Sequence, residues 1–505
     1  MRRLRQLAAR TPAGRERYVD LLRALAIVMV VLGHWAVAAI GEDPTGRPTA
    51  RSALPDLPWA YPLTWVAQVM PVFFLVGGYA NAASLTARRA AGGDAVSWLL
   101  GRGARLLRPT TALLLVIAAG SAVASLVGVE ATLVRTVAWF ATIPLWFLAA
   151  YLLVVPLTPA MYALHRRFGL LVPLALAVLV AAGDLGRALG PAELALPNYV
   201  FGWLAVHQLG FAWRDARAEP PARPDTPTGP GAPTRRGVLT HRLPLSRRAG
   251  GTALLGGLAA TVLLTVGPYP VSMLNVPGER LDNAAPPSLA LLTLTTAQLG
   301  LILLLRDPAE RWLRRSRPWQ AVIAVNAVVL TVFLWHLTAA ILLVGALDAA
   351  GELPTPPVGS AAWLAWRVPW VLMLTVVLAA LVAVFGPVEA RTGPTGRGRD
   401  RRRADGGGAP AQGPEPTGRP HDAGQPRDAG QPHDAGQPAG PGWRGTARAA
   451  VTAAGFAAVV YALAVNAETP KSAPEPLGVP ASALAAYLAG AGALRLLRSG
   501  WGSRG

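Results

Sequence analysis

The chain has 505 residues, of which 52% are hydrophobic and only 15% are charged. A soluble protein of this length carries about 25% charged residues, so the composition argues against a soluble protein and favours a chain embedded in lipid. The sequence contains no cysteine. Disulfide bonds, a thiolate nucleophile and cysteine-ligated zinc or iron–sulfur sites are therefore excluded.

The net charge of +20 comes almost entirely from arginine. These arginines cluster between apolar segments instead of following one face of a helix, a distribution typical of the cytoplasmic loops of membrane proteins. No nucleic-acid-binding motif accompanies them. The charge therefore predicts membrane topology, and no nucleic-acid partner is expected.

Long apolar segments recur along the chain, and each is close to the roughly 20 residues that a helix needs to cross a bilayer. They predict an all-α fold, a polytopic transmembrane helical bundle with about ten core spans. The spans are expected at residues 19–40, 62–86, 109–128, 138–160, 169–186, 195–213, 250–268, 288–305, 320–346 and 363–387. The first is interpreted as a retained helix, because it is longer than the apolar core of a signal peptide and carries ionisable residues.

Arginines concentrate in alternate connections between these spans, beginning with the N-terminal segment 1–18. Positively charged loops remain on the cytoplasmic side during insertion. The pattern predicts a multi-pass protein of the plasma membrane, with a cytoplasmic basic N-terminus at 1–18 and a transmembrane domain at 19–387.

Residues 388–445 are rich in Gly, Pro, Arg and Asp, and they contain HDAGQP from His421, RDAGQP from Arg427 and HDAGQP from His433. Such a segment buries too little apolar surface to offset its ordering entropy, which predicts a disordered linker. Its histidines are interpreted as solvated, and no metal site is predicted. Two weaker segments within 446–498, rich in Ala and Gly, predict a C-terminal transmembrane hairpin.

The first predicted span carries Asp20, Arg23 and His34. An ionisable side chain inside a membrane costs about 2.5–3.5 kcal/mol, so it marks a candidate functional site. Arg23 and His34 lie within about 20° of one another around the helix and roughly 16 Å apart along it. Each also has a structural explanation, because Arg23 can reach the headgroups or pair with Asp20, and His34 can hydrogen-bond a neighbouring helix. Their position on one face favours function.

The segment RYVDLLRALAIVMVVLGHW, residues 17–35, resembles the opening of acyltransferase-3 proteins, in which ten residues separate an arginine from a histidine. Other segments resemble later signatures of that family, namely FFLVGGY from Phe73, RLLR from Arg105, PLWFLAAYLL from Pro144 and FLWHLTAAIL from Phe333. Gly77 stands where the family usually has serine, so a hydroxyl contact to substrate is not expected there. The resemblance covers about residues 15–390 and leaves the linker and the hairpin outside it.

The resemblance implies a membrane-embedded acyltransferase that moves an acyl group, acetyl in many members, from cytoplasmic acyl-CoA to a hydroxyl of a glycan, lipid or exported metabolite. Acyl-CoA would be a co-substrate, and no tightly bound cofactor is expected. Arg23, Arg105 and Arg108 match the acyl-CoA-binding positions, and arginine binds phosphate oxygens bidentately. The topological bias alone also explains Arg105 and Arg108. His34 matches the catalytic position, either as general base on the acceptor hydroxyl or as a covalent acyl carrier.

Four further residues are candidate substrate contacts: Asp20, Trp146, Tyr151 and His336. For His336, hydrogen bonding within the core is as consistent as substrate contact. Trp146 and Tyr151 also fit packing or anchoring at the membrane interface.

The sequence fits two alternative functions less well. Asn326 and His336 lie too close together for the other large family of membrane-bound O-acyltransferases, and no His-x-x-x-x-Asp or Gly-x-Ser-x-Gly motif is present. A transporter or flippase for a small molecule or glycolipid fits the number of spans. It fits less well with the lack of an internal repeat and with the few carboxylates inside the spans. The acceptor, the acyl chain length and the oligomeric state are not predicted.

Overall fold

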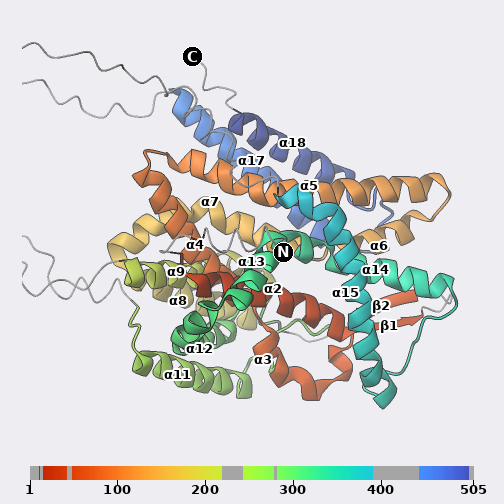
Figure 1. Cartoon of the computed structure of the whole chain (residues 1–505), viewed down its shortest axis with the longest axis horizontal. Helices are drawn as coiled ribbons and strands as arrows, with labels where there is room; N and C mark the ends of the chain where they lie inside the picture. Colours follow the sequence, from red (N-terminus) through yellow and green to blue (C-terminus); the bar gives the residue numbers. More distant parts are fainter. Residues whose placement is uncertain are drawn as a thin grey trace, which may run out of the picture.

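The computed structural model describes residues 11, 15–42, 48–218, 243–277, 281–390 and 443–499, and these are mostly helical. The helices are α2 (Arg17–Val37), α3 (Thr64–Ala67), α4 (Met70–Ala90), α5 (Ala95–Leu126), α6 (Ala131–Thr142), α7 (Leu145–Phe168), α8 (Leu171–Leu189), α9 (Asn198–Ala218), α11 (Arg247–Val266), α12 (Leu289–Leu313), α13 (Ser316–Ala327), α14 (Val329–Ala349), α15 (Ala361–Ala390), α17 (Trp443–Glu468) and α18 (Ala481–Arg498). Short 3₁₀ turns η1 (Leu54–Asp56), η2 (Pro58–Leu63) and η3 (Ala192–Ala195) join some of them. Directly after α2, strands β1 (Ala38–Glu42) and β2 (Pro48–Ser52) pair antiparallel and form a hairpin at one end of the molecule (Figure 1).

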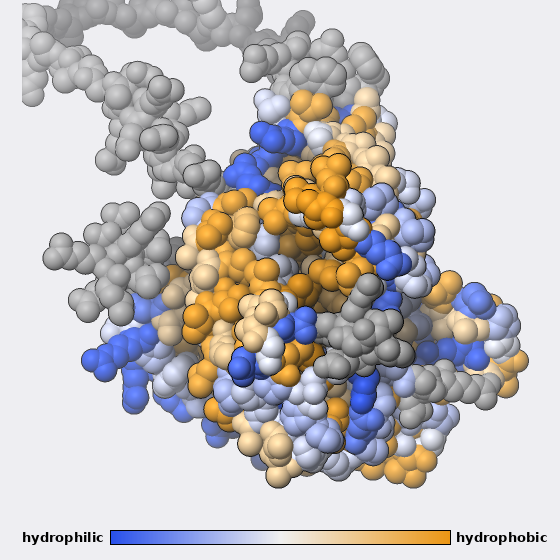
Figure 2. Space-filling view, turned by 90° about the vertical axis from the view of Figure 1, so that its right-hand side faces the viewer, coloured by the Kyte–Doolittle hydropathy of each residue, from blue (hydrophilic) through white to orange (hydrophobic). Residues whose placement is uncertain are grey.

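Ten helices in the described part of the chain are long and apolar enough to cross a membrane: α2, the continuous stretch ending in α4, α5, α7, α8, α11, α12, α14, α15 and α17. Many of their apolar side chains face outward, such as Leu174 on α8 and Val376 on α15, which are 60% and 71% exposed. Figure 2 shows a broad apolar surface on the face of the molecule at which strands β1 and β2 lie. Apolar surface of this extent is costly in water and favourable in lipid. The predicted all-α polytopic bundle is confirmed.

Helix α9, expected at 195–213 as one of the core spans, is not among the ten apolar helices. It lies inside the bundle instead, with Asn198, His207, Gln208 and Asp215 all buried. The other nine expected spans correspond to helices that meet this criterion, and so does α17, which the sequence predicted as part of the C-terminal hairpin.

The single span predicted at 320–346 is wrong, because the structure breaks it at Val328 into α13 and α14. A helix that begins inside a protein has free N–H groups that require acceptors. The carboxylate of Glu389 accepts hydrogen bonds from the amides of Leu330 (3.2 Å) and Thr331 (2.8 Å) and from the Thr331 hydroxyl (2.7 Å). A carboxylate at a helix N-terminus is also favoured by the helix dipole. The span predicted at 138–160 is likewise divided, into α6 and α7.

Glycine allows α4 and α9 to pack with their backbones in contact. A Cβ atom at Gly78 would lie 2.0 Å from the carbonyl oxygen of His207, and one at Gly210 would lie 2.2 Å from that of Leu75. Small residues at such crossings are typical of helix pairs in membranes. This contact fixes α9 in the middle of the bundle.

The C-terminal helices α17 and α18 lie side by side along α5 (Figure 1). Arg135 of α6 is fully buried beneath the connection between them and donates hydrogen bonds to five oxygens. These are Asn466 Oδ1 (2.9 Å) and the carbonyl oxygens of Asn466 (2.8 Å), Thr469 (2.7 Å), Pro470 (3.4 Å) and Gly478 (3.1 Å). The hairpin expected at 446–498 is thus built into the same bundle as the preceding helices. Most of the linker expected at 388–445, namely residues 391–442, lies outside the described residues, as do residues 1–10 and 12–14.

Replacing Arg135 by methionine is expected to destabilise the protein by about 3 kcal/mol, because buried oxygens of Asn466, Thr469 and Gly478 lose their donor. The measurement is thermal unfolding of the purified protein in detergent. Thr136→Ala serves as the control, since the Thr136 hydroxyl reaches the carbonyl of Thr132 in its own helix and, in the hairpin connection, the exposed carbonyl of Lys471. Equal melting temperatures for the two variants would show that the hairpin is not held by Arg135.

Candidate active site

His34 lies in the last turn of α2 and faces His336 of α14. His34 Nδ1 and His336 Nε2 are 3.0 Å apart, and the two rings stack with their centroids 5.0 Å apart at an interplanar angle of 30°. His336 is fully buried, whereas His34 is half-buried. The structure therefore joins two imidazoles that the sequence separates by 302 residues.

The hydrogen bonds of this pair determine which ring nitrogen carries the proton. His336 Nδ1 lies 2.6 Å from the carbonyl oxygen of Phe333, which can only accept, so His336 Nδ1 is protonated. In a neutral ring, His336 Nε2 is then an acceptor, and His34 Nδ1–H must donate to it. In the neutral His34 ring the lone pair is then on Nε2. A histidine oriented in this way by a second group is the arrangement of a general base or nucleophile.

The end of α2 that carries His34 is tied to two neighbouring helices. Trp35 Nε1 donates to the carbonyl oxygen of His336 (3.0 Å), and Trp370 Nε1 of α15 donates to that of Trp35 (3.2 Å). Arg367 of α15 donates to the carbonyl oxygen of Ala38 (2.8 Å). These hydrogen bonds hold the end of α2, and His34 with it, in one geometry.

At the other end of α2, Arg23 pairs with Asp20 at 3.4 Å, and Arg15 binds the second oxygen of the same carboxylate at 2.6 Å. The Arg23 side chain remains 30% exposed, while that of Asp20 is 8% exposed. Asp20, expected as a candidate substrate contact, is thus occupied by two arginines. Its geometry is that of a residue that positions Arg23.

Helix α5 carries arginines at three-residue intervals, Arg102, Arg105 and Arg108. Each step of three residues turns about 60° around the helix, so the three side chains fan out in different directions. Arg102 points into the bundle over the ring of Trp98, 5.9 Å from its centroid, and its charge interacts with Arg23, Arg105 and the Tyr151 hydroxyl. Arg108 instead lines a cavity beside α18. Arg105 lies between Arg102 and Arg108 on the helix, and its charge is repelled by the charges of both Arg498 and Arg23.

Arg102 was missed by the sequence analysis, although the repeated Arg-x-x-Arg spacing could have indicated it. Its Nε atom is buried without a hydrogen-bond partner. Within the described ranges, no carboxylate forms an ion pair with any of the three arginines of α5. Buried positive charge without a counter-charge is unfavourable unless an anion is bound there. Arg102 therefore marks a candidate anion site, to which the exposed Arg105 and the Asp20-paired Arg23 contribute from α5 and α2.

A series of aromatic rings connects this arginine group to the histidine pair. Tyr151 stacks on Phe147 with centroids 6.1 Å apart, Phe147 meets Phe333 edge-on at 5.4 Å, and Phe333 contacts His336 at 6.0 Å. A Cβ atom at Gly77 would lie 2.9 Å from Cε2 of Tyr151. The glycine at this position therefore makes room for the Tyr151 ring, which a serine would displace.

Trp146, the remaining candidate from the sequence, and the buried His207 occupy different surroundings. Trp146 is half-buried in the first turn of α7 and packs against the main hydrophobic core. His207 hydrogen-bonds Asn81 through Nε2 at 3.1 Å and belongs to the contact between α4 and α9. In the described ranges, no three His, Asp or Glu side chains gather as metal ligands. The structure thus brings Arg23, Tyr151 and Arg105 into one group and His34 and His336 into another.

Comparisons with known proteins assign this arrangement to a family. The family model described as "Acyltransferase domain", that of the acyltransferase-3 proteins, matches residues 16–387, which include both the histidine pair and the arginine group. Searches of curated proteins and of solved structures gave no match. The chain belongs to the acyltransferase-3 family and is a multi-pass membrane acyltransferase.

Proposed function

We propose that the protein transfers an acyl group, acetyl in the simplest case, from cytoplasmic acyl-CoA to a hydroxyl group of an envelope glycan, a lipid or an exported metabolite. The observation that carries the proposal is the oriented histidine pair, in which His34 Nε2 retains its lone pair. The proposal places the protein in the plasma membrane with its N-terminus in the cytoplasm.

In this mechanism the phosphates of acyl-CoA bind Arg23, Arg102 and Arg105. The uncompensated charge of Arg102 and Arg105 supports this role, because guanidinium groups bind phosphate oxygens bidentately and the site offers no described carboxylate to either residue. His34 lies roughly 16 Å further along α2 than Arg23. An extended pantetheine arm would carry the thioester along that distance towards the histidine pair.

Two routes are open to His34. As a general base, His34 Nε2 accepts the proton of the acceptor hydroxyl, whose oxygen attacks the thioester carbonyl carbon. The C–S bond then breaks, and CoA leaves as a thiolate that takes up a proton. As a nucleophile, His34 Nε2 attacks the same carbon, and CoA leaves as a thiolate. The acceptor oxygen then attacks the acyl carbon, the C–N bond to His34 breaks, and the hydroxyl proton is released to the thiolate or to solvent. In both routes His336 holds the tautomer of His34.

The test uses membrane vesicles from cells with and without the protein, supplied on the cytoplasmic face with acetyl-CoA carrying an isotopic label in its acetyl group. Mass spectrometry of glycans, lipids and released metabolites is expected to show a labelled product only where the protein is present. Propionyl- and octanoyl-CoA in parallel define the acyl chain. If no acyl-CoA labels a product while a small molecule or glycolipid crosses the membrane in a protein-dependent way, the protein is a transporter and the proposal fails.

A further inference from the structure

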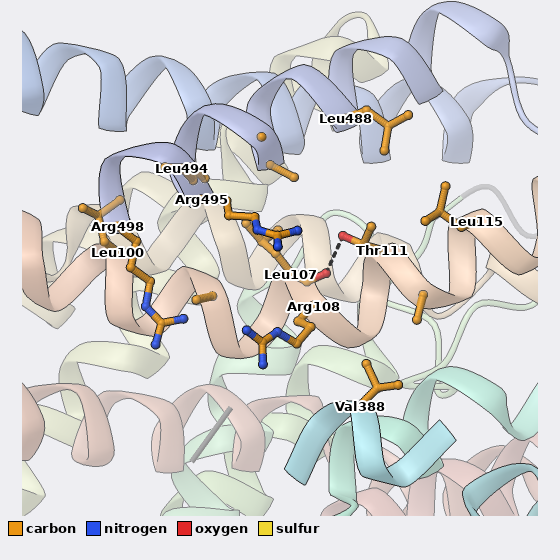
Figure 3. A pocket seen from close by; sticks show the side chains of 14 residues that line it. Leu100, Leu107, Arg108, Thr111, Leu115, Val388, Leu488, Leu494, Arg495 and Arg498 are labelled. Carbon is orange, nitrogen blue, oxygen red and sulfur yellow. Dashed lines mark hydrogen bonds between the residues drawn. The ribbon is translucent and has the colours of Figure 1, made fainter. Parts of the chain in front are cut away.

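A second site lies apart from the histidine pair, in a cavity of about 580 Å³ between α5, α18 and the end of α15 (Figure 3). Its lining residues come from these three helices and include none from α2, α7 or α14, which carry the candidate active site. Helix α18 and the end of α15 after residue 387 also lie outside the segment that matches the family model. The cavity therefore requires a part of the chain that the family domain does not supply.

One end of the cavity is strongly positive. Arg108 of α5 and Arg495 and Arg498 of α18 extend into the space between the helices (Figure 3), and Arg498 also repels Arg105. No carboxylate is among the lining residues. The neighbour of the lining residue Val388, Glu389, accepts hydrogen bonds at the start of α14 instead. Three converging guanidinium groups without an acidic partner in the lining favour a bound anion.

The other end of the cavity is apolar and faces outward. It is lined by Ala112, Leu115 and Leu488, and Leu115 and Leu488 are 48% and 40% exposed. Leu115 lies roughly 10 Å along α5 from Arg108. The cavity thus combines a cationic end with an apolar wall open towards the side of the bundle. This combination matches a molecule with an anionic head and a hydrocarbon chain.

We infer that the cavity binds an anionic phospholipid, with its phosphate among Arg108, Arg495 and Arg498 and one acyl chain along Leu115 and Leu488. Basic pockets between transmembrane helices at the basic ends of those helices are binding sites for anionic headgroups. The bilayer is the source of the ligand, because the apolar wall opens where lipid surrounds the helices. No lining residue belongs to the histidine pair, so a lipid bound in this cavity is not the acyl donor or acceptor of that pair. The inference does not depend on the proposed acyl transfer.

The test measures lipid binding to the full-length protein, delipidated in detergent, by native mass spectrometry. The probes are phosphatidylglycerol and phosphatidylcholine with identical acyl chains. The wild type is expected to bind phosphatidylglycerol preferentially. The double variant R495Q/R498Q is expected to bind it about thirtyfold more weakly, since each arginine near an anionic surface contributes a factor of about five.

The matched control is R247Q/R248Q, which removes two exposed arginines at the start of α11, outside the cavity. It is expected to bind like the wild type, which separates the cavity from the general basicity of the protein. A second variant, Ala112→Phe, fills the apolar part without changing charge and is also expected to weaken binding. Equal melting temperatures for the variants confirm that they fold.

Three outcomes would overturn the inference. Equal loss in both double variants would show that phosphatidylglycerol binds the basic surface as a whole. Equal binding of both lipids would show that the arginines do not select an anionic head. Displacement of phosphatidylglycerol by palmitoyl-CoA, with the affinity for palmitoyl-CoA also lost in R495Q/R498Q, would make the cavity part of a donor site.

Discussion

Replacing His34 by glutamine is expected to lower the rate of acyl transfer at least about a thousandfold while leaving membrane insertion unchanged. Glutamine preserves a hydrogen-bond donor towards His336 Nε2, but it has no basic nitrogen in place of His34 Nε2. The proton of the acceptor hydroxyl would then have no acceptor, and no acyl-imidazole could form. The measurement is label transfer from acyl-CoA in vesicles with matched protein levels.

Variants of His336 test whether that residue acts by positioning His34. His336→Leu removes the acceptor for His34 Nδ1–H and is expected to slow transfer about 10- to 100-fold, the usual effect of losing an orienting partner. His336→Gln retains an acceptor and is expected to recover part of the rate. A shifted pH–rate profile in His336→Leu would distinguish lost orientation from damaged packing. His165→Gln, which changes a buried histidine elsewhere, is the control.

For the first prediction, full activity in His34→Gln would exclude His34 from the chemistry.

Replacing Arg102 by methionine is expected to lower kcat/KM for acyl-CoA about 30- to 150-fold and to leave the melting temperature unchanged or raised. Loss of a charged hydrogen bond to phosphate accounts for about 2–3 kcal/mol of donor binding. Removing an unpaired buried charge is neutral or stabilising in the empty protein. The combined result, weaker use of donor without loss of stability, is characteristic of a functional residue and not of a structural one.

Arg23 belongs to the same arginine group but differs from Arg102 in its exposure and in having a carboxylate partner. Arg23 is 30% exposed and already paired with Asp20, so Arg23→Met is expected to have a smaller effect on kcat/KM than Arg102→Met. Kinetics with varied acyl-CoA and saturating acceptor provide the measurement. Arg311→Gln, at an exposed position on α12, controls for the loss of one positive charge. A melting temperature several degrees lower in Arg102→Met, with kcat/KM unchanged, would assign Arg102 to the scaffold.

The fold class could be predicted because lipid imposes a simple requirement on sequence, a run of about 20 apolar residues for each crossing. The same rule fails for α9, whose polar residues are paired inside the bundle, as Asn198 is with Asp184 at 3.1 Å. It also fails at Val328, where hydropathy continues without interruption while the helix breaks. The break depends on Glu389, 61 residues further along the chain, and no local pattern reports that contact.

The candidate site was predictable only in part for a related reason. The spacing of Arg23 and His34 on one helix follows from helical periodicity, so sequence alone indicated both. The pairing of His34 with His336 arises from packing between α2 and α14, which one sequence does not encode in any local pattern. The separation of Arg108 from Arg105 depends similarly on where α18 lies against α5. Arg102 remained hidden because the family-like RLLR segment begins three residues after it.

The bonds of Arg135 also set an order of events during synthesis. Its partners at Asn466 and Gly478 lie 331 and 343 residues further along the chain. At translation rates of about 5–20 residues per second, they emerge on the order of twenty seconds to a minute after Arg135 itself. Throughout that interval the guanidinium of α6 lacks the oxygens that surround it in the finished protein, and burying a cation without such partners is unfavourable. Helix α6 can therefore reach its final position only after α17 and α18 have been synthesised. A chain whose synthesis stops before α17 would form an incomplete bundle that quality-control proteases can recognise.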